Sequence, residues 1–248
     1  IHTLIIKMKL TLKKRFEHWK RNNKIQREKP EVWLMKDIRV GYIQIPKVAT
    51  RSIQQCLANY YVEKESLDRP IVWDKKTIKK VEEKTAFHAS QKVLSLLSKE
   101  NYIFAFVRNP YDRLYSAYKN KVLQPLEIGG KNIFSNHGVR LAMEFDEFVD
   151  IVCGLTDNRI DRHLRSQAWF LSYEGNVIPK FIGQLECFEK DWASLDKRFN
   201  LGEPVHKNST KSLNIDDYRM KYSRELEEKV YERYKEDFNF FGYERLKF

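Results

Sequence analysis

The stretch Tyr42 to Ser52, YIQIPKVATRS, and its counterpart Tyr102 to Tyr118, YIFAFVRNPYDRLYSAY, decide the fold of this chain. Each begins with an apolar run of strand length, reaches a basic residue and a proline, and continues with helical spacing. Proline ends the strand and fixes the turn, so the following residues lie at the carboxyl edge of the sheet, where open α/β folds bind ligands. We therefore predict an α/β protein with a three-layer, P-loop-like fold, in which helices flank a central parallel sheet.

The first turn predicts a phosphate-binding loop, because the helix that follows it begins with backbone N–H groups that have no partner within the helix. Its candidate ligand residues are Lys47, Val48, Ala49, Thr50, Arg51 and Ser52. The turn has no glycine, so it differs from the G-x-x-x-x-G-K-[ST] loop. The second strand ends at Arg108, where a magnesium-dependent phosphoryl-transfer enzyme would carry an acid. We expect a polyanionic ligand held without a metal, with a further phosphate bound by Arg108 and Ser116, and Arg113 in reserve.

Both stretches resemble motifs of the sulfotransferases that use 3′-phosphoadenosine-5′-phosphosulfate (PAPS). PKVATRS resembles their 5′-phosphosulfate loop, and FVRNPYDRLYSAY resembles their 3′-phosphate motif in the carbohydrate sulfotransferases of the heparan 2-O and HNK-1/chondroitin type. The later segments that also resemble this family are HLRSQ (163–167), FIGQLECFEKDW (181–192), VHKNST (205–210) and YKEDFNFFGY (234–243). The resemblance implies transfer of a sulfonate group from PAPS to a saccharide hydroxyl, with adenosine 3′,5′-bisphosphate as the product.

Sulfonate transfer needs a base for the incoming hydroxyl and positive charge where the phosphosulfate bond breaks. Lys47 is the candidate for the charge, since it follows the strand and the proline. His88 is the candidate base, because FHAS (87–90) resembles the H-x-S segment that carries the base in the heparan 2-O branch. A helix beginning at Ser90 would also disfavour the imidazolium. The rival bases are His163 and then Glu186, and the alternative for His88 is a purely structural role.

The resemblance also assigns the acceptor site and the closing loop. The residues it implies are His163, Arg165 and Gln167 for contact with the acceptor, and Asn208, Ser209 and Lys211 for a late loop over the nucleotide. Basic loops at 123–144 and 157–165 suit an anionic glycan, while a neutral sugar on a glycolipid would serve as well. We read 123–144 as a long surface loop, and the helix after Ser90 as burying Val93, Leu94, Leu96 and Leu97.

The composition favours a folded α/β domain with an anionic partner. The 248 residues are 42% hydrophobic, which is enough for a full core, and the net charge of +12 indicates the partner's sign without identifying it. Two other classes are weaker alternatives. A nucleotide-dependent kinase is disfavoured by the missing glycines, and a nucleic-acid-binding module by basic residues that gather in loops and a tail instead of alternating with aromatics.

Residues 1–31 form a basic amphipathic segment before a single sulfotransferase domain at 32–248. Its pattern predicts a helix that contacts an anionic membrane surface peripherally, or an ordinary solvated helix packed on the domain. No apolar run approaches the ~18 residues of a membrane span. The three cysteines are too few for a disulfide framework or a zinc site. We therefore expect a cytoplasmic protein, or one of the Golgi lumen if an N-terminal anchor has been removed.

Overall fold

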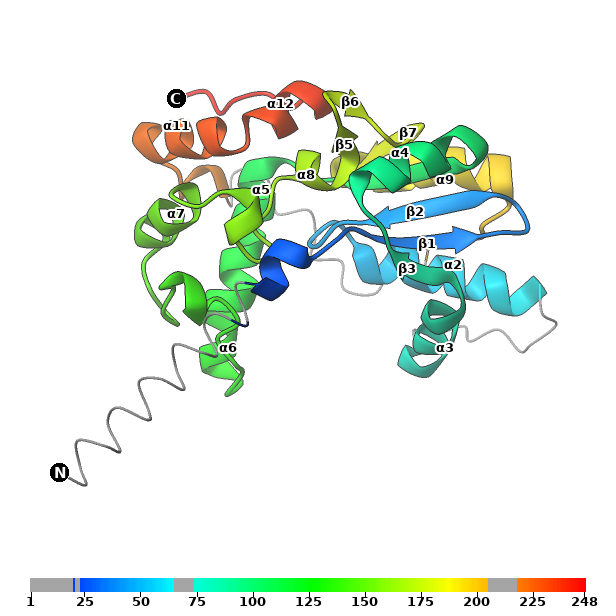
Figure 1. Ribbon diagram of the computed structural model, residues 1–248. Coiled ribbons are helices and arrows are strands. Elements are labelled where there is room, and N and C mark those ends of the chain that lie inside the picture. The colour runs from blue at the N-terminus through cyan, green and yellow to red at the C-terminus, as the bar shows by residue number, and fades with distance from the viewer. Residues whose placement is uncertain (1–19, 21–22, 65–73, 205–217) are drawn as a thin grey trace. The chain divides into compact units, whose positions relative to one another are not determined.

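The computed structural model describes residues 20, 23–64, 74–204 and 218–248, which fall into two compact units (Figure 1). The larger unit contains residues 29–117 and 166–248, and the smaller contains residues 118–165 with the described residues before Lys29. Most of the basic segment at 1–31 lies outside the described residues, and so does the late loop with Asn208, Ser209 and Lys211.

A mixed sheet forms the centre of the larger unit. In the described residues it has five strands in the order β3-β1-β2-β4-β7. The bounds are β1 Glu31–Met35, β2 Val40–Gln44, β3 Ala86–His88, β4 Tyr102–Val107 and β7 Phe181–Gln184. β2, β4 and β7 run parallel, which confirms the α/β class and the two strands predicted from the apolar runs. The sheet is not wholly parallel, however, because β1 forms a hairpin with β2 and pairs antiparallel with β3.

Helices cover both faces of this sheet. Those of the larger unit are α2 Thr50–Lys64, α3 Lys75–Thr85, α4 Gln91–Glu100, α5 Pro110–Tyr118, α8 Gln167–Leu171, α9 Phe188–Phe199, α11 Arg224–Arg233 and α12 Lys235–Phe241. A two-stranded ribbon, β5 Ser172–Tyr173 with β6 Asn176–Val177, follows α8. Figure 1 shows α2 and α3 on one side of the sheet and α4 on the other. The layers therefore follow the predicted α/β arrangement.

Aromatic side chains fill the core between β4 and α9. Tyr42 of β2 stacks on Phe104 of β4 with ring centroids 5.3 Å apart, and Trp192 of α9 meets Phe104 edge-on at 6.4 Å. Phe106 packs against Phe188 with centroids 5.0 Å apart. Pairs of this kind add about 0.5–1.5 kcal/mol each beyond the area that they bury. The strands that lead to the two basic turns are thus held on a rigid aromatic layer.

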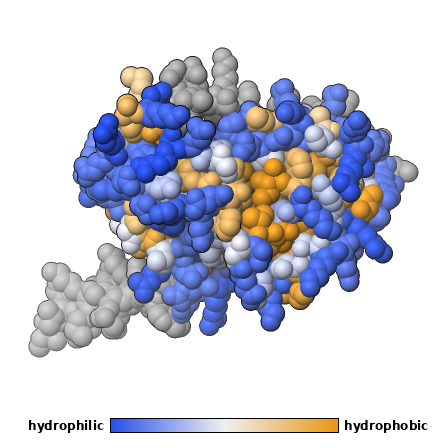
Figure 2. Space-filling view, turned by 90° about the horizontal axis from the view of Figure 1, so that it is seen from above, coloured by the Kyte–Doolittle hydropathy of each residue, from blue (hydrophilic) through white to orange (hydrophobic). Residues whose placement is uncertain are grey.

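Helix α4 buries less of its apolar surface than the sequence pattern predicts. Leu94 is fully buried and Leu97 half-buried, but Val93 and Leu96 are 44% and 54% exposed. The four residues form two adjacent stripes with i, i+3 spacing, and only one stripe can face the sheet. Figure 2 shows an apolar area on the side of the molecule seen from above, which is the side where Figure 1 shows α4.

The smaller unit is helical. Its elements are a π-helical turn at Lys119–Leu123, α6 Gln124–Glu127, 3₁₀ turns at Ser135–His137 and Asp157–Arg159, and α7 Phe145–Cys153. The predicted surface loop at 123–144 is mostly exposed and irregular, but it also contains α6 and buried side chains, among them Phe134 and Val139, and Phe134 packs on Phe148 of α7. Apolar side chains spaced along this segment give it a small core. None of the described helices has the length and apolarity needed to cross a membrane.

Gly183 on β7 provides a test of this packing. A Cβ atom there would run into the ring of Phe106, coming within 2.7 Å of Cδ1, and that ring is wedged among Phe181, Phe188 and Trp192. We expect Gly183→Ala to lower the free energy of unfolding in urea by about 1–3 kcal/mol, the usual range for overpacking.

Gly41→Ala is the matched control. Its Cβ would meet Ile103 Cδ1 at 2.6 Å, which is the end of a flexible side chain that can turn away. The loss of stability should therefore be smaller than at Gly183. Equal losses for the two variants would show that the ring of Phe106 is free to move.

Candidate active site

The loop between β2 and α2 holds two residues in the left-handed backbone region. Lys47 has φ 75° and Ala49 has φ 55°, a conformation that disfavours residues other than glycine. The loop is tied down by Thr50, whose hydroxyl donates to the Ile45 carbonyl at 2.6 Å. Turns of this kind direct backbone N–H groups toward one point and form anion-binding concavities, and α2 begins at Thr50. The predicted phosphate loop therefore has a backbone suited to that role.

Two buried arginines donate hydrogen bonds to backbone carbonyls of this loop. Arg113 Nε donates to the Pro46 carbonyl at 3.2 Å, and Arg108 Nη1 donates to the Lys47 carbonyl at 3.2 Å. Both side chains come from the turn after β4 and from α5, so the second sequence motif supports the backbone of the first. Arg113, which we held in reserve as a phosphate ligand, is used here to fix the loop.

Arg108 is paired with a carboxylate that the sequence analysis did not identify. Its Nε and Nη2 atoms donate to the two oxygens of Asp112 at 2.7 and 2.8 Å, and the arginine is only 3% exposed. Among the described residues, three of the five N–H groups of this guanidinium thus have partners. Asp112 thus occupies the side formed by Nε and Nη2, which leaves the end formed by Nη1 and Nη2 for a phosphate. The i, i+4 spacing of Arg108 and Asp112 in the sequence could have predicted this ion pair.

The other residues predicted for the 3′-phosphate lie on the same short segment. Ser116 is buried on α5, one helical turn after Asp112 and therefore on the same face of the helix. The backbone at Asn109 is held by Glu186, which accepts from the Asn109 N–H at 2.6 Å and from the Tyr243 hydroxyl at 3.0 Å. Both carboxylate oxygens of Glu186 are engaged, so this rival base acts as a support of the turn.

His88 lies at the exposed end of β3, two residues before Ser90, which is the N-cap of α4. Its Nδ1 atom is 3.3 Å from the backbone carbonyl of Lys29. Because a carbonyl oxygen can only accept, Nδ1 carries the proton in this contact and the neutral ring keeps its lone pair on Nε2. The imidazole is thus oriented to accept a proton at Nε2.

The register of the sheet places His88 and the phosphate loop at one edge. Glu31 pairs with Gln44 on one side and with His88 on the other. Since neighbouring strands lie about 4.8 Å apart, the backbones of Gln44 and His88 are separated by about 10 Å. Lys47 follows three residues after Gln44. Lys47, the candidate charge, therefore follows the carboxyl end of β2, and His88, the candidate base, lies at the carboxyl end of β3. These two strands are parallel, with β1 between them.

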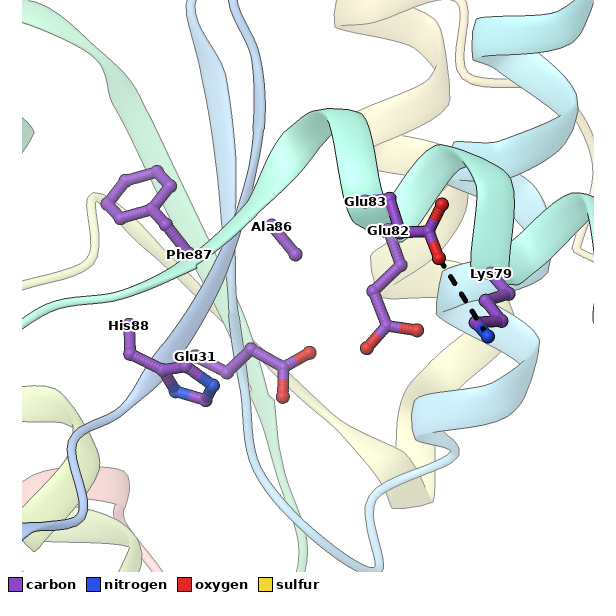
Figure 3. A pocket seen from close by; sticks show the side chains of 7 residues that line it. All are labelled: Glu31, Lys79, Glu82, Glu83, Ala86, Phe87 and His88. Carbon is purple, nitrogen blue, oxygen red and sulfur yellow. Dashed lines mark ion pairs between the residues drawn. The ribbon is translucent and has the colours of Figure 1, made fainter.

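A hollow of about 270 Å³ opens beside His88 (Figure 3). Its lining residues are Glu31, Lys79, Glu82, Glu83, Ala86, Phe87 and His88. Figure 3 shows the imidazole next to the Glu31 side chain, with Glu82 and Glu83 reaching in from α3. Burial, together with the charges of Glu31 and Glu83, raises the pKa of Glu82. The hollow is therefore predominantly acidic, with Lys79 as its one ammonium group, 3.9 Å from Glu83.

The residues predicted for acceptor contact do not share one unit. His163 and Arg165 belong to the smaller unit, and Gln167 to the larger. Arg165 is fully buried, where it donates to the carbonyls of Ile160 at 3.2 Å and Ile25 at 2.6 Å.

His163 pairs with Asp161 through Nδ1 at 2.6 Å. Burial acts to raise the pKa of Asp161, but its hydrogen bonds with His163 outweigh that effect and hold the pKa below its usual value. The assignments of His163 and Arg165 to the acceptor stay predictions.

The fold and the two basic turns define a P-loop-like α/β protein whose sheet edge is built to hold an anion. The family model described as the sulfotransferase family matches residues 30–244, and the chain belongs to this family. It is therefore a transferase of sulfonyl groups, as the resemblance implied, while the heparan 2-O or HNK-1 branch stays a prediction. No curated protein and no solved structure gave a match. Among the described residues, no group of three His, Cys, Asp or Glu side chains is placed to hold a metal ion.

The Arg108 and Asp112 pair should dominate the stability of the site. Arg108→Ala leaves the buried Asp112 carboxylate without this guanidinium, and we expect a loss of about 3–5 kcal/mol in the free energy of unfolding. The double variant Arg108→Ala with Asp112→Ala should recover part of that loss, because no buried charge is then left behind. Urea unfolding of the two single variants and the double variant measures the coupling, and strictly additive losses would contradict it.

Proposed function

We propose that this protein is a carbohydrate O-sulfotransferase that uses PAPS as the sulfonate donor. Residues 47–52 would hold the 5′-phosphosulfate, and Arg108 and Ser116 the 3′-phosphate. The left-handed turn at Lys47 and the two arginines behind it support this assignment, because they present backbone N–H groups and positive charge to a polyanion. When bound, PAPS supplies an activated sulfonate whose leaving group is adenosine 3′,5′-bisphosphate.

The observation that carries the proposal is the register that sets His88 about two strands away from the strand leading to Lys47. An acceptor hydroxyl between them can be deprotonated by His88 Nε2 while its oxygen attacks sulfur. One S–O bond forms, and the S–O bond to the 5′-phosphate breaks in line with it. Lys47 meets the negative charge that develops on the leaving oxygen, since its ammonium group is borne on a flexible stem.

The acidic hollow bears on the choice of acceptor. Glu31, Glu82 and Glu83 would repel a sulfate or carboxylate group held beside His88. Carboxylates also accept hydrogen bonds from sugar hydroxyls, which are abundant on an uncharged sugar. We therefore infer that the sugar unit next to His88 is uncharged, whether it belongs to a glycolipid or to a longer glycan that is anionic elsewhere.

Transfer of labelled sulfate from PAPS to a panel of saccharides tests the function directly. The panel should pair each neutral acceptor with a derivative sulfated next to the reactive hydroxyl. A thermal-shift series with adenosine 3′,5′-bisphosphate, ATP with magnesium, and an oligonucleotide tests the donor site independently. Stabilisation by adenosine 3′,5′-bisphosphate without metal supports the proposal. Stabilisation by ATP with magnesium alone, or by the oligonucleotide alone, would favour the kinase or the nucleic-acid-binding protein.

Lys47→Ala should reduce turnover more than it weakens binding of PAPS. The ammonium group matters most when the leaving oxygen becomes anionic, which happens only in the transition state. Single-turnover rates and nucleotide affinities measured on the same variant separate the two effects. Lys99→Ala is a matched control, because Lys99 is an exposed lysine in the last turn of α4 and has no part in the proposed site, so turnover should stay unchanged. A pure binding defect at Lys47 would remove it from the chemistry.

His88→Ala should slow sulfonate transfer on the order of 10² to 10⁴-fold, the usual contribution of a general base. Affinity for adenosine 3′,5′-bisphosphate should stay nearly unchanged, since the side chain is assigned to the acceptor.

His163→Ala provides the comparison with the rival base. If this variant loses the rate while His88→Ala keeps it, the base is His163. A His88→Ala protein that is folded, binds the nucleotide and transfers sulfate at the wild-type rate would leave His88 with a structural role only.

A further inference from the structure

The side-chain amide of Gln167 completes the hydrogen bonding of β4 at the point where its strand partner ends. The last ladder pair on that side of β4 is Val107 with Gln184, and Arg108 follows. Gln167 Oε1 accepts from the Arg108 N–H at 2.9 Å, and Gln167 Nε2 donates to the Arg108 carbonyl at 2.8 Å. Because the N–H can only donate and the carbonyl can only accept, the orientation of the amide is fixed.

Asp237 of α12 holds Gln167 in this orientation. Its Oδ2 atom accepts from the Gln167 backbone N–H at 2.9 Å and from Nε2 at 3.4 Å, and its Oδ1 atom accepts from the Ala168 N–H at 2.7 Å. Both Asp237 and Gln167 are fully buried. The carboxylate thus caps the start of α8 and orients the amide at once. The amide of Gln167 faces Arg108 and Asp237, so it does not reach toward an acceptor as the sequence analysis expected.

The consequence for the site is that the N–H and the carbonyl of Arg108 are both held by Gln167 before a ligand binds. Its guanidinium is then oriented by Asp112 and by the Lys47 carbonyl. A binding group held in advance loses little conformational entropy when the ligand arrives. If the amide were removed, the Arg108 turn would lose two hydrogen bonds, and the direction of the guanidinium would be less well defined.

We propose that Gln167 is a positioning residue that gives the site its selectivity for a nucleotide with a 3′-phosphate. It acts through Arg108 and touches no substrate. The inference rests on the proposed function, in which Arg108 binds the 3′-phosphate of PAPS. It extends that function by assigning the selectivity to a contact between α8 and the end of β4, supported from α12.

Gln167→Met tests the proposal, because methionine has nearly the same volume and cannot form the two hydrogen bonds. Calorimetry gives the dissociation constants for adenosine 3′,5′-bisphosphate and adenosine 5′-phosphate, and their ratio measures the selectivity. We expect the variant's preference for the bisphosphate to fall about tenfold, as when a hydrogen bond to a charged group is lost. Affinity for the 5′-phosphate should change little.

Gln91→Met is the matched control. Gln91 Nε2 donates to the Trp169 carbonyl at 2.7 Å, so the same substitution removes an amide contact to the same helix, α8, without touching Arg108. This variant should keep the wild-type selectivity even if its melting temperature falls. If Gln167 contributes to stability alone, Gln167→Met should lower the melting temperature and weaken the binding of both nucleotides equally. That result would overturn the proposal.

The outcomes separate this inference from the proposed function. If the wild type does not prefer the bisphosphate over the 5′-phosphate, the assignment of a 3′-phosphate site is wrong. If the wild type has the preference and folded Gln167→Met retains it, only the role of Gln167 is wrong.

Gln167→Glu is the second test variant, for use if Gln167→Met does not fold. A protonated glutamic acid offers one accepting oxygen and one O–H donor, which suffice for the N–H and the carbonyl of Arg108, but it lacks the second N–H that the amide directs at Asp237 of α12. Its selectivity relative to the wild type should therefore be retained at low pH and decline as the acid ionises. A ratio to the wild type that stays constant with pH would overturn the proposal.

Discussion

The rest of the site depends on the buried guanidinium of Arg108. It joins the end of β4 to Asp112 of α5, and it reaches the carbonyl of Lys47, which lies 61 positions earlier in the chain. A buried ion pair stabilises a fold only when its remaining hydrogen bonds are also satisfied. Here the carboxylate and the loop carbonyl meet that condition together, so the strained turn at Lys47 is held by the same group that closes the ion pair. The backbone shape of the loop at Lys47 and the positive charge beside it therefore depend on the same side chain, Arg108.

The sheet edge carries charge of opposite sign at its two ends. Lys47, Arg108 and Arg113 surround the loop after β2, whereas Glu31, Glu82 and Glu83 line the hollow beside β3. An anionic donor is attracted to the first region and repelled from the second. Under the proposed function, this charge pattern would orient the polyanionic donor along the edge and would keep the imidazole of His88 clear for the acceptor.

Local patterns in the sequence were sufficient to find the central elements. The sequence predicts strands at 40–45 and 102–107 and a helix at 188–199. β4 and α9 have these bounds and β2 ends one residue earlier, because short apolar runs and helical spacing are local signals. β3 has only three residues, which is too short for any periodicity. β1 was missed because its apolar residues directly follow Pro30, at the end of what read as a basic segment.

The residues that hold Arg108 in place show what local sequence patterns cannot predict. Arg108 was recognised from its motif, and Asp112 could have been found from its spacing on the helix. Gln167 and Asp237 are separated from their partners by 59 and 70 positions, and a buried amide or carboxylate leaves no local pattern. Gln167 was even placed in the acceptor site, because the segment HLRSQ (163–167) resembles one that the family uses near the acceptor. Only the packing of α8 and α12 on the end of β4 reveals what it contacts.

The two ends of this sheet edge differ in how strongly their residues depend on one another, and the difference affects how the protein can evolve. The turn at Arg108 is shared by α5, α8 and the phosphate loop, so a substitution there disturbs several contacts at once. The hollow beside His88 is lined mainly by side chains of α3 and of the short edge strand β3, none of which supports that turn. Descendants of such a gene can therefore change the lining of the hollow through substitutions in α3, while the turn at Arg108 is inherited unaltered.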